Sequence, residues 1–275
     1  MNLLPLFWRL SLLGIATLFF GGCSTVSGAE RVSSELATHS YKLRGQGTPV
    51  VILEAGLGDG KESWAPILKP ISRTATVFAY DRAGYGSSKS TNQSRDGATI
   101  VAELRATLRS MELDPPFVLV GHSIGGTYME LFARTYPDDV AGVVLIEARH
   151  ADFDRQCRAA GARMCDPPAI LGALLPRGPK RELAGGDRTM QEVMTAGPFP
   201  NVPITVLSSP NKFLEGKQFR EVWMDTQESL ATLSSKSQHV ICDRCGHYIH
   251  RDNPELVTSS VVEMVELIRG EIAKQ

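Results

Sequence analysis

The sequence has almost no net charge, no internal repeat and no low-complexity tract. Its 29 lysines and arginines nearly balance 30 aspartates and glutamates, which leaves a formal charge of −1 at neutral pH. A protein with this balance has no overall field that would attract nucleic acid. Without repeats, one large core is the simplest organisation for 275 residues that are 43% hydrophobic. We therefore expect a single main domain and no nucleic-acid partner.

The chain also lacks an apolar run that would comfortably cross a bilayer. Arg9 precedes its most prominent run, residues 10–20, which is shorter than the roughly 20 residues of a membrane-spanning helix. A positive residue, a short apolar segment and then small residues are typical of a signal peptide. We expect residues 1–22 to be such a peptide, residues 23–35 to be a polar tether, and the protein to be exported.

The string FGGCS, which ends the apolar segment, resembles the lipobox of bacterial lipoproteins. The resemblance implies cleavage before Cys23, attachment of lipid to its thiol, and anchoring to a bacterial envelope membrane. Ser24, where an aspartate would be the other option, implies the periplasmic side of the outer membrane. Phe20 departs from the usual leucine, so a protein secreted without lipid, or held by an uncleaved segment, is the alternative.

Four cysteines remain besides Cys23, and an even number in an exported chain favours disulfides. Closeness in sequence favours the pairs Cys157–Cys165 and Cys242–Cys245. The C-x-x-C of the second pair could also form a redox site, but it lacks the strand-to-helix context of a thioredoxin-like protein. No second C-x-x-C accompanies it, so we expect structural disulfides and no metal site.

A serine between glycines lies where an apolar strand runs into a helix. Gly121, Ser123 and Gly125 match G-x-S-x-G, in which the serine occupies a sharp turn and its neighbours must be small. The turn lifts the hydroxyl above the sheet. It also brings the N–H of Ile124 to a helix N-terminus, where developing negative charge is stabilised. The pattern predicts a serine nucleophile and one oxyanion donor.

Buried apolar strands alternate with amphipathic helices along most of the chain, which indicates a mostly parallel central sheet covered by helices. The expected strands are 50–54, 75–80, 117–120, 142–147, 204–207 and 239–241, with short edge strands in 31–44. The expected helices are 63–71, 99–112, the one after Ser123, 221–233 and 254–271. From about 149 to 200 the alternation stops, and we expect a small inserted lid with weak helical pieces at 169–175 and 189–195.

Four strings in order, LEAGLGDG, YDRAGYGSS, GHSIGG and CGHYIHRDNPELV, resemble the α/β-hydrolase fold superfamily, most of all its single-domain serine esterase-like branch. The resemblance covers residues 41–274 and implies an α/β-hydrolase domain at 36–275. It implies a triad of serine, distal histidine and acid, with no cofactor. It also implies that Leu57 gives the second oxyanion N–H, and that Asp81 and Arg82 are mainly structural.

His247 is the candidate base among six histidines. It follows the last short strand, comes after Gly246 in a loop, and lies after the serine, as the chain order of this fold requires. A histidine so placed takes the proton from a serine hydroxyl, which by itself is a weak nucleophile. The histidines with a less suitable context are His39, His122, His150, His239 and His250.

The acid is the member of the triad that the sequence determines least. In most relatives of this fold it follows the strand that corresponds to 204–207, but here Ser208-Ser209-Pro210-Asn211-Lys212 follows, without a carboxylate. Glu147 ends the preceding strand, a position that pancreatic-type lipases use, and it is our first candidate. The alternatives are Glu215, Asp152 and Asp154.

Together these residues predict a serine hydrolase that cleaves carboxylic esters of small or medium acyl groups through an acyl-enzyme on Ser123. Acyl transfer, amide cleavage or carbon–carbon cleavage by the same triad are alternatives. A lipid-anchored binding protein without activity, or a thiol–disulfide protein using Cys242 and Cys245, are the alternatives from other classes. Ser123, where an aspartate would be needed, argues against dehalogenase chemistry.

Overall fold

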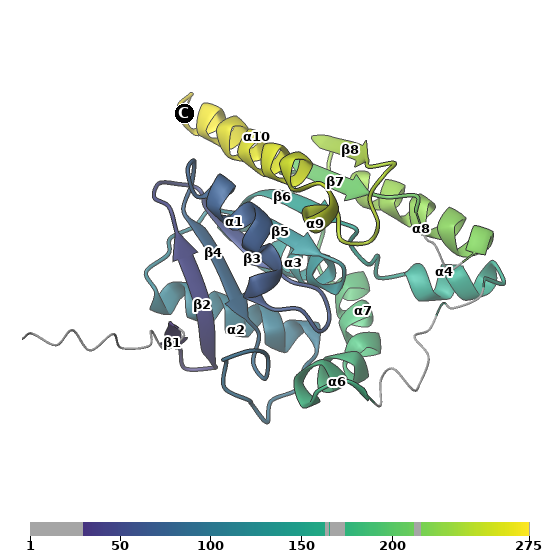
Figure 1. The fold of residues 1–275 in the computed structure, drawn as a ribbon, viewed down its shortest axis with the longest axis horizontal. Coiled ribbons are helices and arrows are strands. Elements are labelled where there is room, and N and C mark those ends of the chain that lie inside the picture. The colour runs from purple at the N-terminus through teal and green to yellow at the C-terminus, as the bar shows by residue number, and fades with distance from the viewer. Residues whose placement is uncertain (1–29, 163–164, 166–173, 212–215, 275) are drawn as a thin grey trace, which may run out of the picture.

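The computed structural model describes residues 30–162, 165, 174–211 and 216–274 of the chain. The strands in these residues form one sheet, with the order β1-β2-β4-β3-β5-β6-β7-β8 (Figure 1). Strands β3 to β8 are parallel, whereas β1 and β2 run antiparallel to their neighbours. The predicted fold class, α/β with a mostly parallel sheet, is therefore confirmed. The strands are β1 (Arg31–Ser33), β2 (Thr38–Arg44), β3 (Val50–Glu54), β4 (Val77–Asp81), β5 (Phe117–His122), β6 (Val140–Ile146), β7 (Ile204–Ser208) and β8 (Ser237–Ile241).

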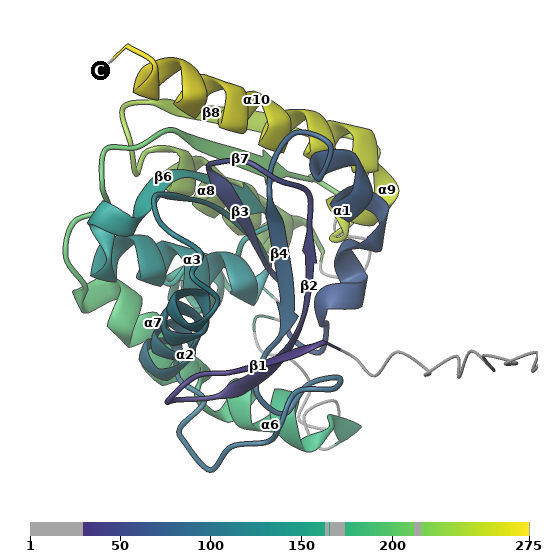
Figure 2. The same cartoon turned by 90° about the vertical axis from the view of Figure 1, so that its left-hand side faces the viewer.

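Helices cover both faces of the sheet, and Figure 2 shows α10 and α2 on opposite sides of the strands. The α-helices are α1 (Ala65–Ile71), α2 (Gly97–Ser110), α3 (Ile124–Thr135), α4 (Phe153–Ala159), α6 (Arg177–Ala184), α7 (Gly186–Thr195), α8 (Gly216–Ala231), α9 (Ile249–Asp252) and α10 (Pro254–Ile272). Two short 3₁₀ helices, η1 (Lys61–Trp64) and η2 (Pro137–Asp139), precede α1 and β6.

Two hydrophobic cores lie on the two faces of the sheet. Along β3, Val50 and Ile52 belong to the core under α2, α3, α7 and α8, whereas Val51 and Leu53 belong to the core under α1, α9 and α10. Successive side chains of a strand point to opposite faces, so a strand covered on both sides is apolar throughout. This is why the central strands were recognisable from apolar runs alone.

Helices α4 and α6 lie in the segment between β6 and β7, where the sequence predicted only weak helical pieces. α7 is present where one piece was expected, and most of the other piece, 169–175, lies outside the described residues. Helix α6 has Gly178 and Pro179 in its first turn and few apolar residues, so its sequence offers no apolar stripe from which a helix could be predicted. Residues 149–200 are called the inserted segment below.

The N-terminal part of the described chain is in the sheet, because β1 pairs with β2. The sheet therefore begins at Arg31, before residue 35, where the tether was expected to end. Residues 1–29, with the predicted signal peptide and Cys23, lie outside the described residues. Within the part of the chain that the structure describes, no helix combines the length and the apolar character needed to cross a membrane.

Candidate active site

Ser123 occupies a strained turn between β5 and α3. Its φ of 55° and ψ of −126° lie in a region that residues with a side chain rarely adopt. The two flanking glycines permit this turn: a Cβ on Gly121 would lie 2.6 Å from the Cα of Gly126, and a Cβ on Gly125 would collide with the carbonyl oxygen of Glu54. Only hydrogen at these positions lets the strand and the helix approach so closely.

Leu57, Ser123 and Ile124 line one cavity of about 370 Å³. Ile124 is the first residue of α3, so its N–H has no carbonyl within the helix to bond. Leu57 lies in the turn that follows β3. The two predicted oxyanion donors thus border the same space as the serine. Donors in such positions can stabilise negative charge on a carbonyl oxygen of a bound molecule.

Glu147 and His247 are in contact. The Nδ1 atom of His247 lies 3.2 Å from Oε2 of Glu147, whose side chain is fully buried at the end of β6. The other carboxylate oxygen, Oε1, accepts hydrogen bonds from the backbone N–H of Ser209 at 2.7 Å and from the indole N–H of Trp223 at 3.2 Å. Three donors therefore orient this carboxylate, which is suited to hold an imidazole in one tautomer.

Two of the alternative acids, Asp152 and Asp154, pair with arginines. Asp152 accepts hydrogen bonds from Arg155, and Asp154 accepts one from Arg149. Asp154 lines the cavity with Ser123 and also pairs with this arginine. Glu215 lies outside the described residues.

His122, which precedes the serine, packs against three rings of the segment after β8. The ring centroids of His247 and His250 each lie 4.7 Å from that of His122, and that of Tyr248 lies at 4.9 Å. Burial, together with the charges of His247 and His250, lowers the pKa of His122 well below its ordinary value. As a neutral imidazole, His122 donates from Nε2 to the backbone carbonyl of His247 at 2.8 Å.

His250 is part of the same cluster and is also fully buried. Its Nε2 lies 3.1 Å from the hydroxyl of Ser63. Burial, followed by the charges of Arg251 and His247, lowers the pKa of His250 to about 3. Like His122, it is therefore a packed neutral ring at ordinary pH. The more exposed His247, at 38% of its side chain, is the ring of this cluster that meets the carboxylate.

The sequence did not reveal a buried ionic network next to Leu57. The guanidinium of Arg82 donates to the backbone carbonyls of Ala55 at 2.6 Å and Gly56 at 2.9 Å, the two residues before Leu57. The same group pairs with Glu54 at 2.6 Å and with Glu182 of α6 at 2.9 Å. Burial raises the pKa of Glu54 despite the opposing charge of Arg82. Arg82 thus ties the predicted oxyanion loop to the inserted segment.

The structure contains both of the disulfides expected from sequence proximity, Cys157–Cys165 and Cys242–Cys245. The first joins α4 to a residue that also lines the cavity, Cys165. The second closes the turn directly after β8, two residues before His247, and both of its cysteines are buried. Within the described ranges, no three histidine, cysteine, aspartate or glutamate side chains gather in a way that could hold a metal ion.

Comparisons with known proteins agree with this architecture. A family model described as alpha/beta hydrolase fold matches residues 49–191. Protein YqjL of Bacillus subtilis is 26% identical over 235 residues, which cover 83% of this chain and 88% of that protein. A thermophilic esterase from Thermogutta terrifontis superposes with a TM-score of 0.67 at 19% identity, over 87% of this chain and 99% of the esterase. An ancestral haloalkane dehalogenase superposes with a TM-score of 0.66 at 17% identity, over 88% and 99%.

Proposed function

Because the chain belongs to the alpha/beta hydrolase fold family, whose model matches just over half of it, we propose that it is a serine hydrolase that cleaves carboxylic esters. The observation that carries this proposal is the contact of His247 with the buried Glu147, in a loop that packs against the residue before Ser123. A serine hydroxyl is activated by a histidine that a carboxylate orients, and here the loop of such a histidine is bonded to the residue before a serine on a strained turn.

The proposed reaction proceeds through an acyl-enzyme. The Oγ atom of Ser123 attacks the ester carbonyl carbon while its proton passes to Nε2 of His247, whose Nδ1–H stays bonded to Glu147. The N–H groups of Leu57 and Ile124 bind the resulting oxyanion. The carbonyl re-forms, the C–O bond to the alcohol breaks, and His247 gives the alcohol its proton. Water then attacks the acyl carbon by the same steps, which releases the acid and restores Ser123.

The walls of the cavity favour an ester of small or medium size. The volume of about 370 Å³ is near the lower end of the range for small-molecule sites. Met190 and Phe219 supply apolar surface, whereas Arg149 and Asp154 add a polar side. A short acyl group would therefore lie against the apolar wall of Met190 and Phe219. The haloalkane dehalogenases share the fold, but Ser123 stands where their chemistry requires an aspartate.

A fluorophosphonate probe and p-nitrophenyl esters of graded chain length test the proposal. We expect the probe to label wild-type protein at Ser123, and hydrolysis to be fastest for short or medium acyl chains. The Ser123→Ala variant should lose both labelling and turnover. A wild-type protein that is folded but neither labelled nor active on any of these esters would instead be the non-catalytic binding protein.

We also propose that Cys23 carries lipid and holds the enzyme at the periplasmic side of the outer membrane. The support is the lipobox-like string around Cys23 and the apolar segment before it. Growth of an expressing bacterium with a labelled fatty acid should label the wild-type protein and leave the Cys23→Ser variant unlabelled. Equal labelling of both proteins, or of neither, would refute the anchor.

A further inference from the structure

The loop that carries His247 is held by the residue that also holds Glu147. The hydroxyl of Ser209 donates to the backbone carbonyl of Cys245, two residues before His247, while the backbone N–H of Ser209 donates to Oε1 of Glu147 at 2.7 Å. Ser209 is fully buried and directly follows β7. Ser209 thus binds both Glu147 and the turn that leads to His247, the two residues that meet at 3.2 Å.

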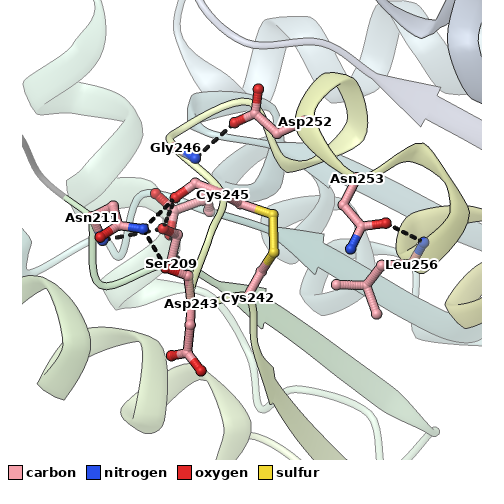
Figure 3. The surroundings of a disulfide bond; sticks show 10 residues. Ser209, Asn211, Cys242, Asp243, Cys245, Gly246, Asp252, Asn253 and Leu256 are labelled. Atoms are coloured by element: carbon pink, nitrogen blue, oxygen red, sulfur yellow. Dashed lines mark hydrogen bonds between the residues drawn. A yellow bond between two sulfur atoms is a disulfide. The ribbon is translucent and has the colours of Figure 1, made fainter.

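A disulfide closes the turn that Ser209 binds. Figure 3 shows the Cys242–Cys245 bond beside Ser209 and Asn211, with dashed lines from both residues to the carbonyl of Cys245. The amide of Asn211 reaches that carbonyl at 3.1 Å, and its backbone N–H donates to the Ser209 hydroxyl at 3.1 Å. The disulfide and these hydrogen bonds therefore fix the position of the Cys245 carbonyl relative to Ser209.

We propose that Ser209 is a positioning residue of the active site, which keeps Glu147 and the disulfide-closed turn before His247 in register. The inference rests on the proposed function for its effect on turnover. Most relatives of this fold have their acid just after the strand that corresponds to β7. In this chain Glu147 comes from the end of β6, and the position after β7 is used to bind that acid instead.

The length of the Glu147–His247 contact explains why such support matters. A distance of 3.2 Å is at the long end of the N–H···O range, so a small outward shift of the loop would break the hydrogen bond. The His247 side chain is 38% exposed, and its own packing constrains it less than that of a buried ring. In an active site, displacement by about 1 Å can lower the rate by about 100-fold.

The Ser209→Ala variant tests the proposal without disturbing the fold. Asn211 still donates to the Cys245 carbonyl, and the backbone of residue 209 still donates to Glu147. The backbone N–H of Asn211 loses its bond to the Ser209 hydroxyl, but Asn211 is an exposed residue, so water can replace that bond. We expect kcat for a p-nitrophenyl ester to fall about tenfold, the effect of one typical hydrogen bond, with KM changed less than twofold. Replacing both Cys242 and Cys245 by alanine should lower kcat by at least as much.

A double-mutant cycle with Glu147→Gln separates positioning from general destabilisation. If Ser209 acts through the contact between Glu147 and His247, then Ser209→Ala should not lower kcat further once that contact is lost. Ser234→Ala is the matched control, because Ser234 is a buried serine whose hydroxyl also joins two loops, through Asn201 and Lys236. It should affect thermal stability alone. An unchanged kcat in Ser209→Ala, or an equal loss in both backgrounds, would overturn the proposal.

Proton NMR gives a readout that does not depend on esterase activity. The Nδ1 proton of His247, identified by its absence in Glu147→Gln, should give a downfield signal in wild-type protein. That signal should weaken or vanish in Ser209→Ala and persist in Ser234→Ala. If it persists unchanged in Ser209→Ala, the positioning role is wrong even for an active enzyme. If it responds as expected in a protein that cleaves no ester, the proposed function is wrong and the positioning role stands.

Discussion

The imidazole Nε2 of His122 lies 2.8 Å from the backbone carbonyl oxygen of His247, although 125 residues separate them in the chain. Because His122 directly precedes Ser123, this hydrogen bond ties the backbone of the proposed base to the strand that carries the proposed nucleophile. The residue before the serine is therefore a bridge within the site.

Replacing His122 by phenylalanine should keep the ring packing and remove the donor. The carbonyl of His247 would then lose this partner, at a cost of about 1–3 kcal/mol in the free energy of unfolding. We expect kcat to fall about tenfold with little change in KM, measured together with urea denaturation. His239→Phe, which removes a half-buried imidazole on β8, is the comparison and should leave kcat nearly unchanged. Equal kcat values for the two variants would contradict the bridge.

Glu147→Gln should lower turnover by about four orders of magnitude. The glutamine can keep one oxygen for the N–H groups of Ser209 and Trp223, but its NH₂ then faces Nδ1 of His247 and favours the wrong tautomer. Steady-state kinetics of Glu147→Gln and Asp152→Asn compare two of the four candidate acids. Near-normal turnover in Glu147→Gln, or a comparable loss in Asp152→Asn, would assign the acid elsewhere.

Glu182→Gln should weaken both the fold and the reaction. It removes a negative charge from the buried guanidinium of Arg82, and breaking such a pair typically costs about 3–5 kcal/mol. Arg82 also holds the carbonyls of Ala55 and Gly56, so we expect a loss of kcat at a temperature where the variant is fully folded. Glu130→Gln breaks a pair with Arg134 within α3, neither of which bonds this loop, and should leave kcat unchanged. A normal kcat in folded Glu182→Gln would show that the network does not serve the oxyanion loop.

Buried His39 should make the protein less stable in acid. Burial, then the charges of Arg95 and Arg82, lowers the pKa of His39 to about 3, against 6.5 for an ordinary histidine. The unfolded chain therefore binds a proton below pH 6.5 that the folded protein refuses until about pH 3. Between pH 6.5 and about 3, the free energy of unfolding therefore decreases as the pH is lowered. The decrease is about 1.4 kcal/mol per pH unit for each such group.

Urea denaturation of wild type and His39→Gln between pH 7 and 5 measures this contribution. Burial raises the pKa values of Glu54 and Glu103, so these carboxyl groups make both proteins more stable as the pH is lowered. The difference between the two proteins in the slope of unfolding free energy against pH therefore isolates His39. The variant should show a smaller loss of stability on acidification. Parallel curves would mean that His39 carries a proton in the folded state.

The features that were predictable from sequence are local ones. The turn at Ser123 needs small residues at fixed spacing, and central strands covered on both faces need apolar residues without interruption. Both requirements leave a continuous signature in the chain. The inserted segment leaves a weaker one: part of α7 was expected, whereas α6 depends on a buried ion pair, through Glu182, more than on an apolar stripe.

The supporting residues of the site were not predictable because their partners are distant in sequence. Ser209 is 36 residues from Cys245, and Glu182 is 100 residues from Arg82. The sequence around a single serine or glutamate does not indicate which distant residue it will contact. One indirect signal existed: no carboxylate follows the strand at 204–207, and this absence led to Glu147 as the candidate acid.

The pairing of Arg82 with Glu182 limits how the inserted segment can be exchanged. Helix α6 does more than line the cavity, since it brings the carboxylate that pairs with the guanidinium bonded to the proposed oxyanion loop. A chimera that receives the corresponding segment from another hydrolase would need an acidic residue at the same place. Without such a residue, the buried guanidinium of Arg82 would lose one of its carboxylate partners. A chimera made to change substrate preference would then be less stable and less active.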